Sequence, residues 1–436
     1  MISRRTVATG AIALLGMILC TSAVFAQLPT PDYSGEFLNR STLTGDWGGI
    51  RQDWANKGIT LNANVTQITQ GVVDGGKNGA WVYGGRGDLT GVLETDKLGL
   101  WPGGFLTAEL EGNWTNSVSG KTGALMPANS NQLFPLPSHD NVALPALYYA
   151  QFLSHYFGIM AGKVQTGSTG DHNEFAHGKG DSQFFNLAFN LNPVVLTVPY
   201  STLGVGAIVL PTADPEQAIV QFAVFSATGK ASEAGFDNIN GAVFLTEGRM
   251  RTGFFDLTGH QLLGAFYSNK AYTSLDQRLS SIIQDQTITK RDGTWAMYYN
   301  FDQFLYETEE GSAKGIGLFG RFGAGQDAPN PAHYFYSLGV GAKGLIPDRA
   351  NDQFGVGYYY IDVTNPTLQR RRSTISALQD EWGFELYYNL ALTPWLLLSP
   401  DVQVLGGAQK QQIFSASSRR TVPDATVLGF RLQVIL

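Results

Sequence analysis

Side chains alternate between apolar and polar along several stretches of this chain, and this period of two most constrains its fold. In the last stretch, 426–436, Leu428 and Phe430 share one strand face. Gly429 and Arg431 share the other. Successive side chains of a strand point to opposite faces, so each such stretch is predicted to be a strand with one apolar and one polar side. The last stretch alone fits a soluble β-sandwich as well as a lipid-embedded barrel.

The overall charge decides between these two folds. Only 15% of the 436 residues are charged, whereas ordinary soluble domains carry about a quarter. The few charges lie on the polar faces of the predicted strands. Charges on one face and apolar side chains on the other are typical of a water-filled lumen surrounded by lipid. The sequence therefore predicts an all-β fold, a transmembrane antiparallel β-barrel formed by residues 59–436.

The polar faces carry the predicted function. Arg86 and Asp88 are two positions apart, so their Cα atoms lie about 7 Å apart on one face. Fixed groups of both signs offer donors and acceptors to sugar hydroxyl groups, whereas rings of one sign would select ions. The alternative is that these pairs only satisfy one another in the wall. The predicted pore-lining and substrate-binding residues are Arg86, Asp88, Glu94, Glu109, Glu111, Lys163, Arg321 and Glu385.

Residues 1–26 have the features of a removable signal peptide. Arg4 and Arg5 precede an apolar stretch that ends in a Val-Phe-Ala cleavage site at 24–26. Removing the two arginines takes the formal net charge from −7 to −9. An acidic chain is not expected to bind nucleic acid. The only cysteine, Cys20, lies in this segment, so the mature chain is expected to have no disulfide and no cysteine metal site.

The segment 27–58 is predicted to be periplasmic and to contain one short helix. Asp46 is a suitable N-cap, Trp47 and Trp54 would share a helical face, and Gly58 follows the last turn. After Gly58 the period changes from the helical repeat to two. No later run of apolar residues is long enough for a transmembrane helix.

Later stretches follow the same alternation and differ in their connections. Tyr148, Ala150 and Phe152 form an apolar row, which is expected to face lipid. Short turns alternate with longer polar insertions, as in barrels with short periplasmic turns and long outer loops. The insertion 166–192 is long enough to fold inward and narrow a pore.

Other motifs have simpler explanations than catalysis. The stretches 315–320 and 339–344 match the dinucleotide fingerprint, but neither opens a helix, so their glycines are better explained by close backbone approach. His172 and His177 lack the order of a zinc-binding His-Glu-x-x-His motif and are more simply loop residues. The sequence has no Gly-x-Ser-x-Gly nucleophile motif. We therefore expect neither an enzyme nor a cofactor or metal.

With these features the chain resembles the carbohydrate-selective porin family of outer membranes, the OprB type. The opening motif, LTGDWGGIR, is the most specific element of this resemblance. The similarity extends over essentially the whole mature chain, and together the ordered blocks are more specific than any one of them. The resembling blocks are 43–51, 96–98, 102–103, 162–163, 346–349, 381–388 and 399–403.

The resemblance implies a barrel of about sixteen strands in the bacterial outer membrane. It also implies passive, selective diffusion of carbohydrates, monosaccharides such as glucose, without energy input. The alternative is a general, non-selective porin for small polar solutes. An outer-membrane enzyme or adhesin has no supporting motif or repeat region. The implied partners are sugars in transit, outer-membrane lipid, lipopolysaccharide and the barrel-assembly machinery, and an oligomer is compatible with the sequence.

Overall fold

The fold was derived from a computed structural model. The predicted signal peptide, 1–26, lies outside the described residues. The structure describes residues 28–114, 116–135, 142–167, 170–236, 239–274, 277–278, 290–309, 311–327, 329–364, 367–370, 373–376, 378–409, 411–415 and 418–436.

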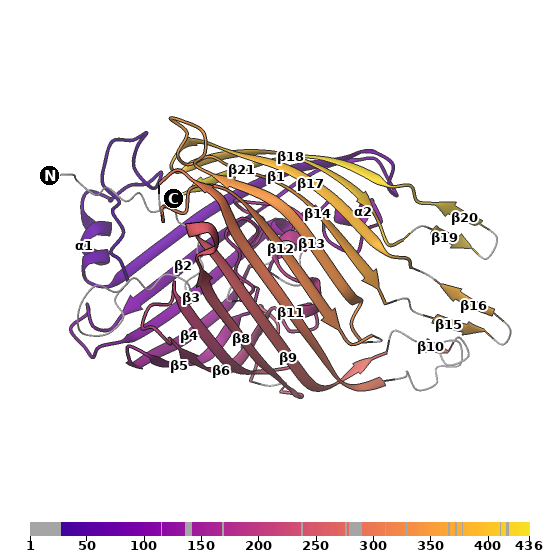
Figure 1. The fold of residues 1–436 in the computed structure, drawn as a ribbon, viewed down its shortest axis with the longest axis horizontal. Helices are drawn as coiled ribbons and strands as arrows, with labels where there is room; N and C mark the ends of the chain where they lie inside the picture. The colour runs from indigo at the N-terminus through magenta and orange to yellow at the C-terminus, as the bar shows by residue number, and fades with distance from the viewer. Residues whose placement is uncertain are drawn as a thin grey trace.

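Sixteen long strands of the described chain close into one antiparallel barrel, in which each strand pairs with its neighbours in the chain and the first pairs with the last (Figure 1). The predicted barrel is therefore confirmed. The barrel strands are β1 (Ile59–Asp74), β2 (Trp81–Glu94), β3 (Gly104–Trp114), β4 (Val142–Ser154), β5 (Phe157–Gln165), β6 (Ser201–Val209), β7 (Ala218–Ser226), β8 (Ala242–Thr252), β9 (Gly259–Thr273), β11 (Lys290–Glu307), β12 (Gly315–Gly325), β13 (Ala332–Lys343), β14 (Gln353–Val363), β17 (Glu381–Thr393), β18 (Leu396–Gly406) and β21 (Ala425–Ile435).

The two ends of the barrel differ in their connections. At one end, here called the turn end, short turns join the strands. The helix α1 (Ile50–Asn56) and the C-terminus also lie at this end (Figure 1). The other end, the loop end, carries the long connections. Two small sheets extend from it, formed by β10 (Gln277–Arg278), β15 (Thr367–Arg370) and β16 (Ser373–Ser376), and by β19 (Gln411–Ser415) and β20 (Ser418–Thr421). In outer-membrane barrels short turns face the periplasm.

The seam between β1 and β21 is bridged by Arg51 of α1. Its guanidinium donates to the carbonyl oxygen of Leu61 at 2.6 Å, in β1, and to that of Leu436 at 3.0 Å, after β21. Its Cζ atom lies 4.0 Å from the centre of the Tyr33 ring. A guanidinium has five donors, so this one side chain satisfies carbonyl groups on both strands. Arg51 and Ala55 are the residues that α1 buries.

The predicted helix exists, but its expected N-cap is wrong. Gly49 occupies the N-cap position in the left-handed region, with φ 94°. Asp46 lies further upstream, where its carboxylate accepts from the Gly48 amide at 3.1 Å. Two glycines with positive φ separate Asp46 from the helix, so its side chain closes a local turn instead of capping. Gly58 follows the helix with φ 85°, as expected.

The strand faces alternate as predicted, with one reversal. On β2 the inward side chains Arg86 and Asp88 are buried, whereas Leu89 is exposed on the outside. On β4 the row expected to face lipid points inward instead: Phe152 is buried and its ring lies 6.1 Å from that of Phe105 on β3. Leu153 is exposed on the outer face of β4. Periodicity shows which residues share a face but not which face is inside.

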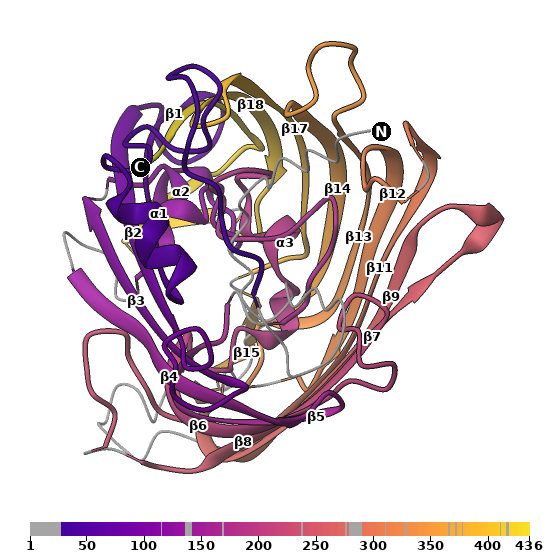
Figure 2. The same cartoon turned by 90° about the vertical axis from the view of Figure 1, so that its left-hand side faces the viewer.

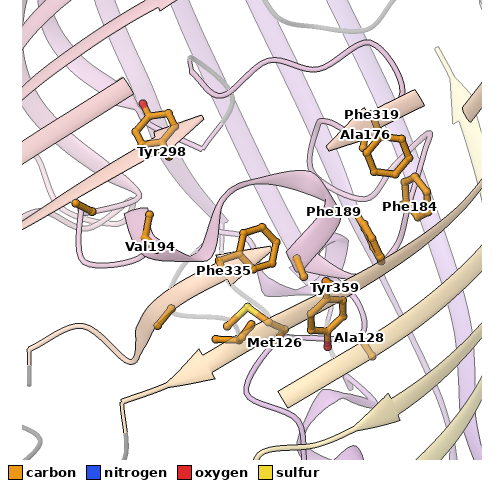
Figure 3. Close-up of a cluster of buried hydrophobic side chains, with 14 of the residues drawn as sticks. Met126, Ala128, Ala176, Phe184, Phe189, Val194, Tyr298, Phe319, Phe335 and Tyr359 are labelled. Carbon is orange, nitrogen blue, oxygen red and sulfur yellow. The ribbon is translucent and has the colours of Figure 1, made fainter. Parts of the chain in front are cut away.

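Two connections from the loop end fold into the barrel, and we name them the inner segment (116–135) and the inner loop (170–200). The inner segment contains α2 (Ser119–Thr122) and η1 (Asn131–Leu133), and the inner loop contains α3 (Leu187–Asn190) and η2 (Pro193–Val195). Both pack against the wall in one apolar cluster. Figure 3 shows this cluster, which includes Met126, Ala128, Phe184, Phe189, Phe319, Phe335 and Tyr359.

The described residues 170–192 of the insertion 166–192 therefore fold inward, as the length of the insertion suggested. One further short helix, η3 (Phe254–Asp256), lies in the β8–β9 turn. Among the helices in the described part of the chain, none has the length and apolar character needed to cross a membrane.

Candidate functional site

The inner loop is attached to the barrel wall at several places, and Arg321 of β12 forms the first attachment described. Its Nε donates to Asp171 Oδ2 at 2.9 Å, and its other nitrogens donate to the carbonyl oxygens of Phe189 at 2.9 Å and Ala176 at 2.6 Å. Asn300 of β11 donates to Asp171 Oδ1 at 2.8 Å. Burial raises the pKa of Asp171, although Arg321 opposes this shift. Arg321 thus holds three positions of the inner loop at once.

Glu385 and Arg431 form the second attachment. The Glu385 carboxylate on β17 accepts from the backbone amides of Phe185 at 2.5 Å and Asn186 at 2.9 Å. Arg431 on β21 donates to the carbonyl oxygen of Gly180 at 2.9 Å, and its Cζ atom lies 4.2 Å from the centre of the Phe185 ring. One carboxylate and one guanidinium thereby bind opposite polar groups of the same backbone stretch.

The third attachment is a charge cluster on β2 and β3. Lys179 of the inner loop lies 2.7 Å from Glu109 Oε1 and 3.6 Å from Asp88 Oδ1, and it also donates to Glu111. Arg86 Nε donates to Asp88 Oδ2 at 3.0 Å. Burial disfavours the charged amine, but the three carboxylates outweigh burial and raise the pKa of Lys179. The ammonium group and the carboxylates therefore hold the inner loop electrostatically.

This cluster also contains the only candidate metal ligands found within the described residues. One oxygen each of Asp88, Glu109 and Glu111 lies within 4.8 Å of the others. Three carboxylate oxygens at this spacing suit a hard cation. The Lys179 ammonium group already lies among them, and the Tyr200 hydroxyl donates to Glu111 at 2.6 Å. These carboxylates could therefore hold a cation only if Lys179 moved away.

The structure brings six of the eight predicted residues into these attachments. Arg86, Asp88, Glu109 and Glu111 meet at one place, and Arg321 and Glu385 lie at the other two. All six face inward, but they are buried. Arg86 is 0% exposed and Glu385 is 1% exposed, because the inner loop covers them. Their direct contacts are with the inner loop, with the inner segment, with each other or with neighbouring wall side chains such as Gln165 of β5.

Glu94 lies at the turn end of β2, far along the strand from the attachments. Its carboxylate pairs with Lys97 Nζ at 2.9 Å, in the β2–β3 turn. Lys97 also donates to the carbonyl oxygen of Leu28 at 2.6 Å. Glu94 therefore belongs to the mouth of the barrel and to the N-terminal segment.

Lys163 does not face the interior, so its prediction as a lumen-lining residue is wrong. It pairs in register with Leu147 of β4, which is 44% exposed on the outer face. Its Nζ donates to the carbonyl oxygens of Ala231 at 2.8 Å and Glu233 at 2.6 Å, in the β7–β8 connection. The period of two places Lys163 in the same row as apolar Ala161, and the buried connection supplies its acceptors.

Glycines on the wall make room for aromatic rings of the inner loop. A Cβ atom at Gly341 would lie 2.4 Å from Cβ of Phe175, and one at Gly355 would lie 2.9 Å from the Phe184 ring. The stretch 339–344 therefore uses its glycine for close approach, as expected. Ring and backbone meet without an intervening side chain, so the wall selects the position of the loop by shape as well as by charge.

A further attachment joins the inner loop to β13, the ion pair between Glu174 and Lys343. The Glu174 side chain is 13% exposed and that of Lys343 is 28% exposed, so this pair is the more open one. Burial opposes ionisation of Glu174, but Lys343 holds its pKa below the ordinary value. Because the loop has no periodicity, sequence reasoning missed Glu174 together with Lys179 and Asp171.

Two histidines of the inner loop are held neutral. The rings of His172 and His177 lie 4.7 Å apart. Burial, together with the nearby Arg321, lowers the pKa of His177 to about 3. Burial and the neighbouring histidine lower the pKa of His172 well below its ordinary value. The docked loop therefore excludes the protonated form of both side chains.

A closed sixteen-stranded barrel with an apolar outside and a charged, loop-narrowed inside defines a porin, a diffusion channel of the outer membrane. Comparison with known families agrees with this class. The family described as "Carbohydrate-selective porin, OprB family" matches residues 78–436, and the chain belongs to this family. As a member with a closed barrel, the protein is located in the bacterial outer membrane.

Individual relatives are more distant. Porin B of Pseudomonas aeruginosa is 23% identical over 208 residues, which are 42% of this chain and 43% of that protein, so the match spans less than half of that relative. The high-pH structure of Pseudomonas putida OprB has a TM-score of 0.75 at 19% identity and covers 92% of this chain and 100% of that one. Its low-pH structure has a TM-score of 0.55 at 16% identity, with 91% and 99% covered. These two likenesses show a common fold.

Proposed function

We propose that this protein lets small sugars, monosaccharides such as glucose, diffuse passively and selectively across the outer membrane. The observation that carries the proposal is the inner loop, which is attached to the wall by fixed charges of both signs at several places. Such a loop narrows the passage permanently. Conduction requires contacts that favour entry without trapping the solute. Mixed donors and acceptors beside a narrow passage suit a neutral polyhydroxyl solute better than an ion.

We propose roles for the eight predicted residues that differ from lining the lumen. The six buried ones set the position of the inner loop and so the shape of the passage. The partly open pair Glu174 and Lys343 is proposed to contact the solute. Glu94 is proposed to act at the turn-end mouth, and Lys163 has no proposed contact with the solute. The proposal includes no chemical step and no cofactor.

The remaining partners and boundaries are part of the same proposal. Large apolar side chains on the outer face are exposed, among them Val205 at 58%, Leu263 at 59% and Leu338 at 57%. We propose that lipid and lipopolysaccharide of the outer membrane cover this face, and that the barrel-assembly machinery inserts the chain. Residues 1–26 are proposed to be removed, and 27–58 to be periplasmic.

Liposome swelling tests the proposal. Purified protein in liposomes is exposed to glucose, to sugars of graded size and stereochemistry, and to linear polyols of matched mass. Faster swelling with glucose than with a matched polyol, together with block of single-channel current by millimolar glucose, is the expected result. Equal rates for all solutes of equal size, with no block, would instead establish the general, non-selective porin.

A variant pair locates the solute contact. Glu174→Gln with Lys343→Met removes both charges and keeps the side-chain lengths close to the originals. The double variant is expected to weaken current block by glucose while leaving the heat-modifiable folded form on a gel unchanged. The matched control is Lys57→Met, because Lys57 pairs with Asp53 on the exposed surface of α1. Unchanged block in the double variant would remove Glu174 and Lys343 from the solute path.

A further inference from the structure

The inner wall near the turn end is apolar from β3 to β7. Ordered apolar side chains are unexpected beside a passage for polar solutes, because sugar hydroxyl groups find no partners there. A small cavity of about 30 Å³ lies against this wall. The apolar side chains that form its wall are Phe105, Phe152, Met160, Ile208, Leu210 and Ile219. We name this cavity the turn-end pocket.

The turn-end pocket already has an occupant from the same chain. Leu28 packs against its cluster of buried side chains and lines the cavity. The backbone at this position is held as well, because Lys97 Nζ donates to the carbonyl oxygen of Leu28 at 2.6 Å and pairs with Glu94 at 2.9 Å. One apolar side chain and one lysine therefore position this end of the N-terminal segment.

The segment 28–37, here called the N-terminal strap, runs from the pocket across the opening. Its middle is held at α1, where the Tyr33 amide donates to Gln52 Oε1 at 3.1 Å and the Tyr33 ring packs on Arg51. Its far end lies at the β17–β18 turn, where Trp395 Nε1 donates to the carbonyl oxygen of Phe37 at 2.8 Å. Figure 2 shows the indigo N-terminal trace crossing the mouth at this end.

We propose that the N-terminal strap restricts the turn-end mouth and that Leu28 in the turn-end pocket is its latch. In the docked position the strap lies across the opening. In the released position Leu28 leaves the pocket, whereas the contacts from Pro31 to Phe37 remain. This inference rests on the proposed function, because a strap matters to transport only where solutes pass the mouth.

The free energy of burying Leu28 is large enough to favour the docked strap and small enough to allow release. Burial of one leucine side chain shifts a two-state equilibrium by roughly 10- to 100-fold. The released position is therefore a minor state that a single substitution can make the major one. The cavity of about 30 Å³ beside Leu28 leaves room for the extra volume of a phenylalanine side chain at position 28. Substitutions at position 28 can therefore either raise or lower the released fraction.

The first experiment changes the latch alone. Leu28→Asp puts a carboxylate into an apolar pocket and is expected to raise the released fraction about 10- to 100-fold, which increases single-channel conductance and sugar entry into liposomes. Leu28→Phe fills more of the cavity and is expected to reduce spontaneous conductance steps. The matched control is Leu38→Asp, because Leu38 is 62% exposed in the same part of the chain. Intact mass must show the same mature N-terminus in all variants.

The second experiment holds the latch covalently. The only cysteine of the chain is Cys20, so Leu28→Cys with Ile219→Cys introduces a unique pair across the pocket once the leader is removed. Oxidation is expected to keep wild-type conductance, and reduction is expected to raise it, because cysteine fills less of the pocket than leucine. If Leu28→Asp fails to assemble, the cysteine pair still tests whether the strap restricts the mouth.

The outcomes separate the two proposals. Conductance that is equal in Leu28→Asp and wild type, or equal in the oxidised and reduced cysteine pair, overturns the strap. A change in ion conductance on release, with no sugar entering liposomes in any variant, supports the strap and overturns the proposed sugar transport. Sugar entry that is identical in all variants supports the channel and overturns the strap.

Discussion

Two arcs of the inner wall differ in what covers them. In the first, formed by β11–β14, β17, β18, β21 and β1–β3, charged side chains and glycines receive the inner loop and the inner segment. In the second, formed by the turn-end parts of β3–β7, the inward side chains are apolar and Leu28 packs on them. The same period of two produces both arcs, so the inward residue type alone makes the difference.

The comparison shows how a loop is fixed in a single position inside a barrel. Charge-assisted hydrogen bonds are directional, and each removed partner leaves a buried polar group unsatisfied. Apolar burial is non-directional and tolerates displacement. The first arc therefore fixes the inner loop, whereas the second provides a contact that can form and break.

Removing Arg321 tests the contrast most severely. Arg321→Met keeps the aliphatic stem but leaves Asp171 as a buried carboxylate without its cation. Docking of the inner loop is expected to weaken by about 3–5 kcal/mol. Limited proteolysis of the folded barrel should then cut within 170–200, and conductance should rise. Lys57→Ala, in an exposed ion pair, is the control and should change neither. An uncut loop in Arg321→Met would contradict the role of this attachment.

Adding one methyl group to the wall tests the fit of loop and glycine. In Gly341→Ala the new Cβ atom would meet Cβ of Phe175 at 2.4 Å, which is not the flexible end of that side chain. The inner loop must shift, at a cost of about 1–3 kcal/mol. Gly87→Ala is the control, because its Cβ atom would meet only Asn64 O at 3.8 Å. Equal hydrogen-exchange protection of the loop in both variants would show that shape does not position it.

Acid should weaken the docked loop. The docked loop holds the pKa of His177 at about 3, against about 6.5 in a released loop. The released loop therefore binds the proton first, so the contribution of a neutral His177 is present above about pH 6.5 and is lost as the pH falls toward 3. The slope is about 1.4 kcal/mol per pH unit. Loop proteolysis at pH 7.5 and 5 measures this effect, and His177→Gln should reduce it, leaving the part due to His172, whose pKa is lowered in the same direction; equal slopes would exclude His177.

The smallest effect is expected at the open ion pair. Lys343→Met removes a partly exposed cation beside the passage, and such pairs contribute about 0–1 kcal/mol to stability. The loop should stay docked, while the reversal potential in a salt gradient should move toward cation selectivity. The isosteric change Glu174→Gln should move it the opposite way. Shifts of the same sign in both variants would show that neither charge faces the passage.

The strand pattern could be read from the sequence because alternation is a local property. Which side of a strand faces inward depends on its partners, so the row of Tyr148, Ala150 and Phe152 was assigned to the wrong side. The prediction that Lys163 lines the lumen is wrong for a related reason, because it relies on the charge of Lys163 and not on its position in an apolar row. Arg431 lies on the polar face of the last strand, where the pattern could have found it.

The inner loop was predictable only as a long insertion. Lys179 and Asp171 lie in a stretch without periodicity, and their partners are more than 60 positions away in the chain. No spacing rule connects residues at such separations. Burial of the charged wall residues follows from the loop covering them, so their change from lining groups to attachment points could not be inferred without the docked loop.

The contact of Arg51 with Leu436 has a consequence for the order of assembly. These residues are separated by 385 positions, so chain entropy opposes their meeting until the strands between them have paired. The guanidinium can reach both carbonyl groups only after the first and last strands have joined. Protection of this side chain from an arginine-specific reagent would thus mark the moment at which the growing sheet becomes a ring.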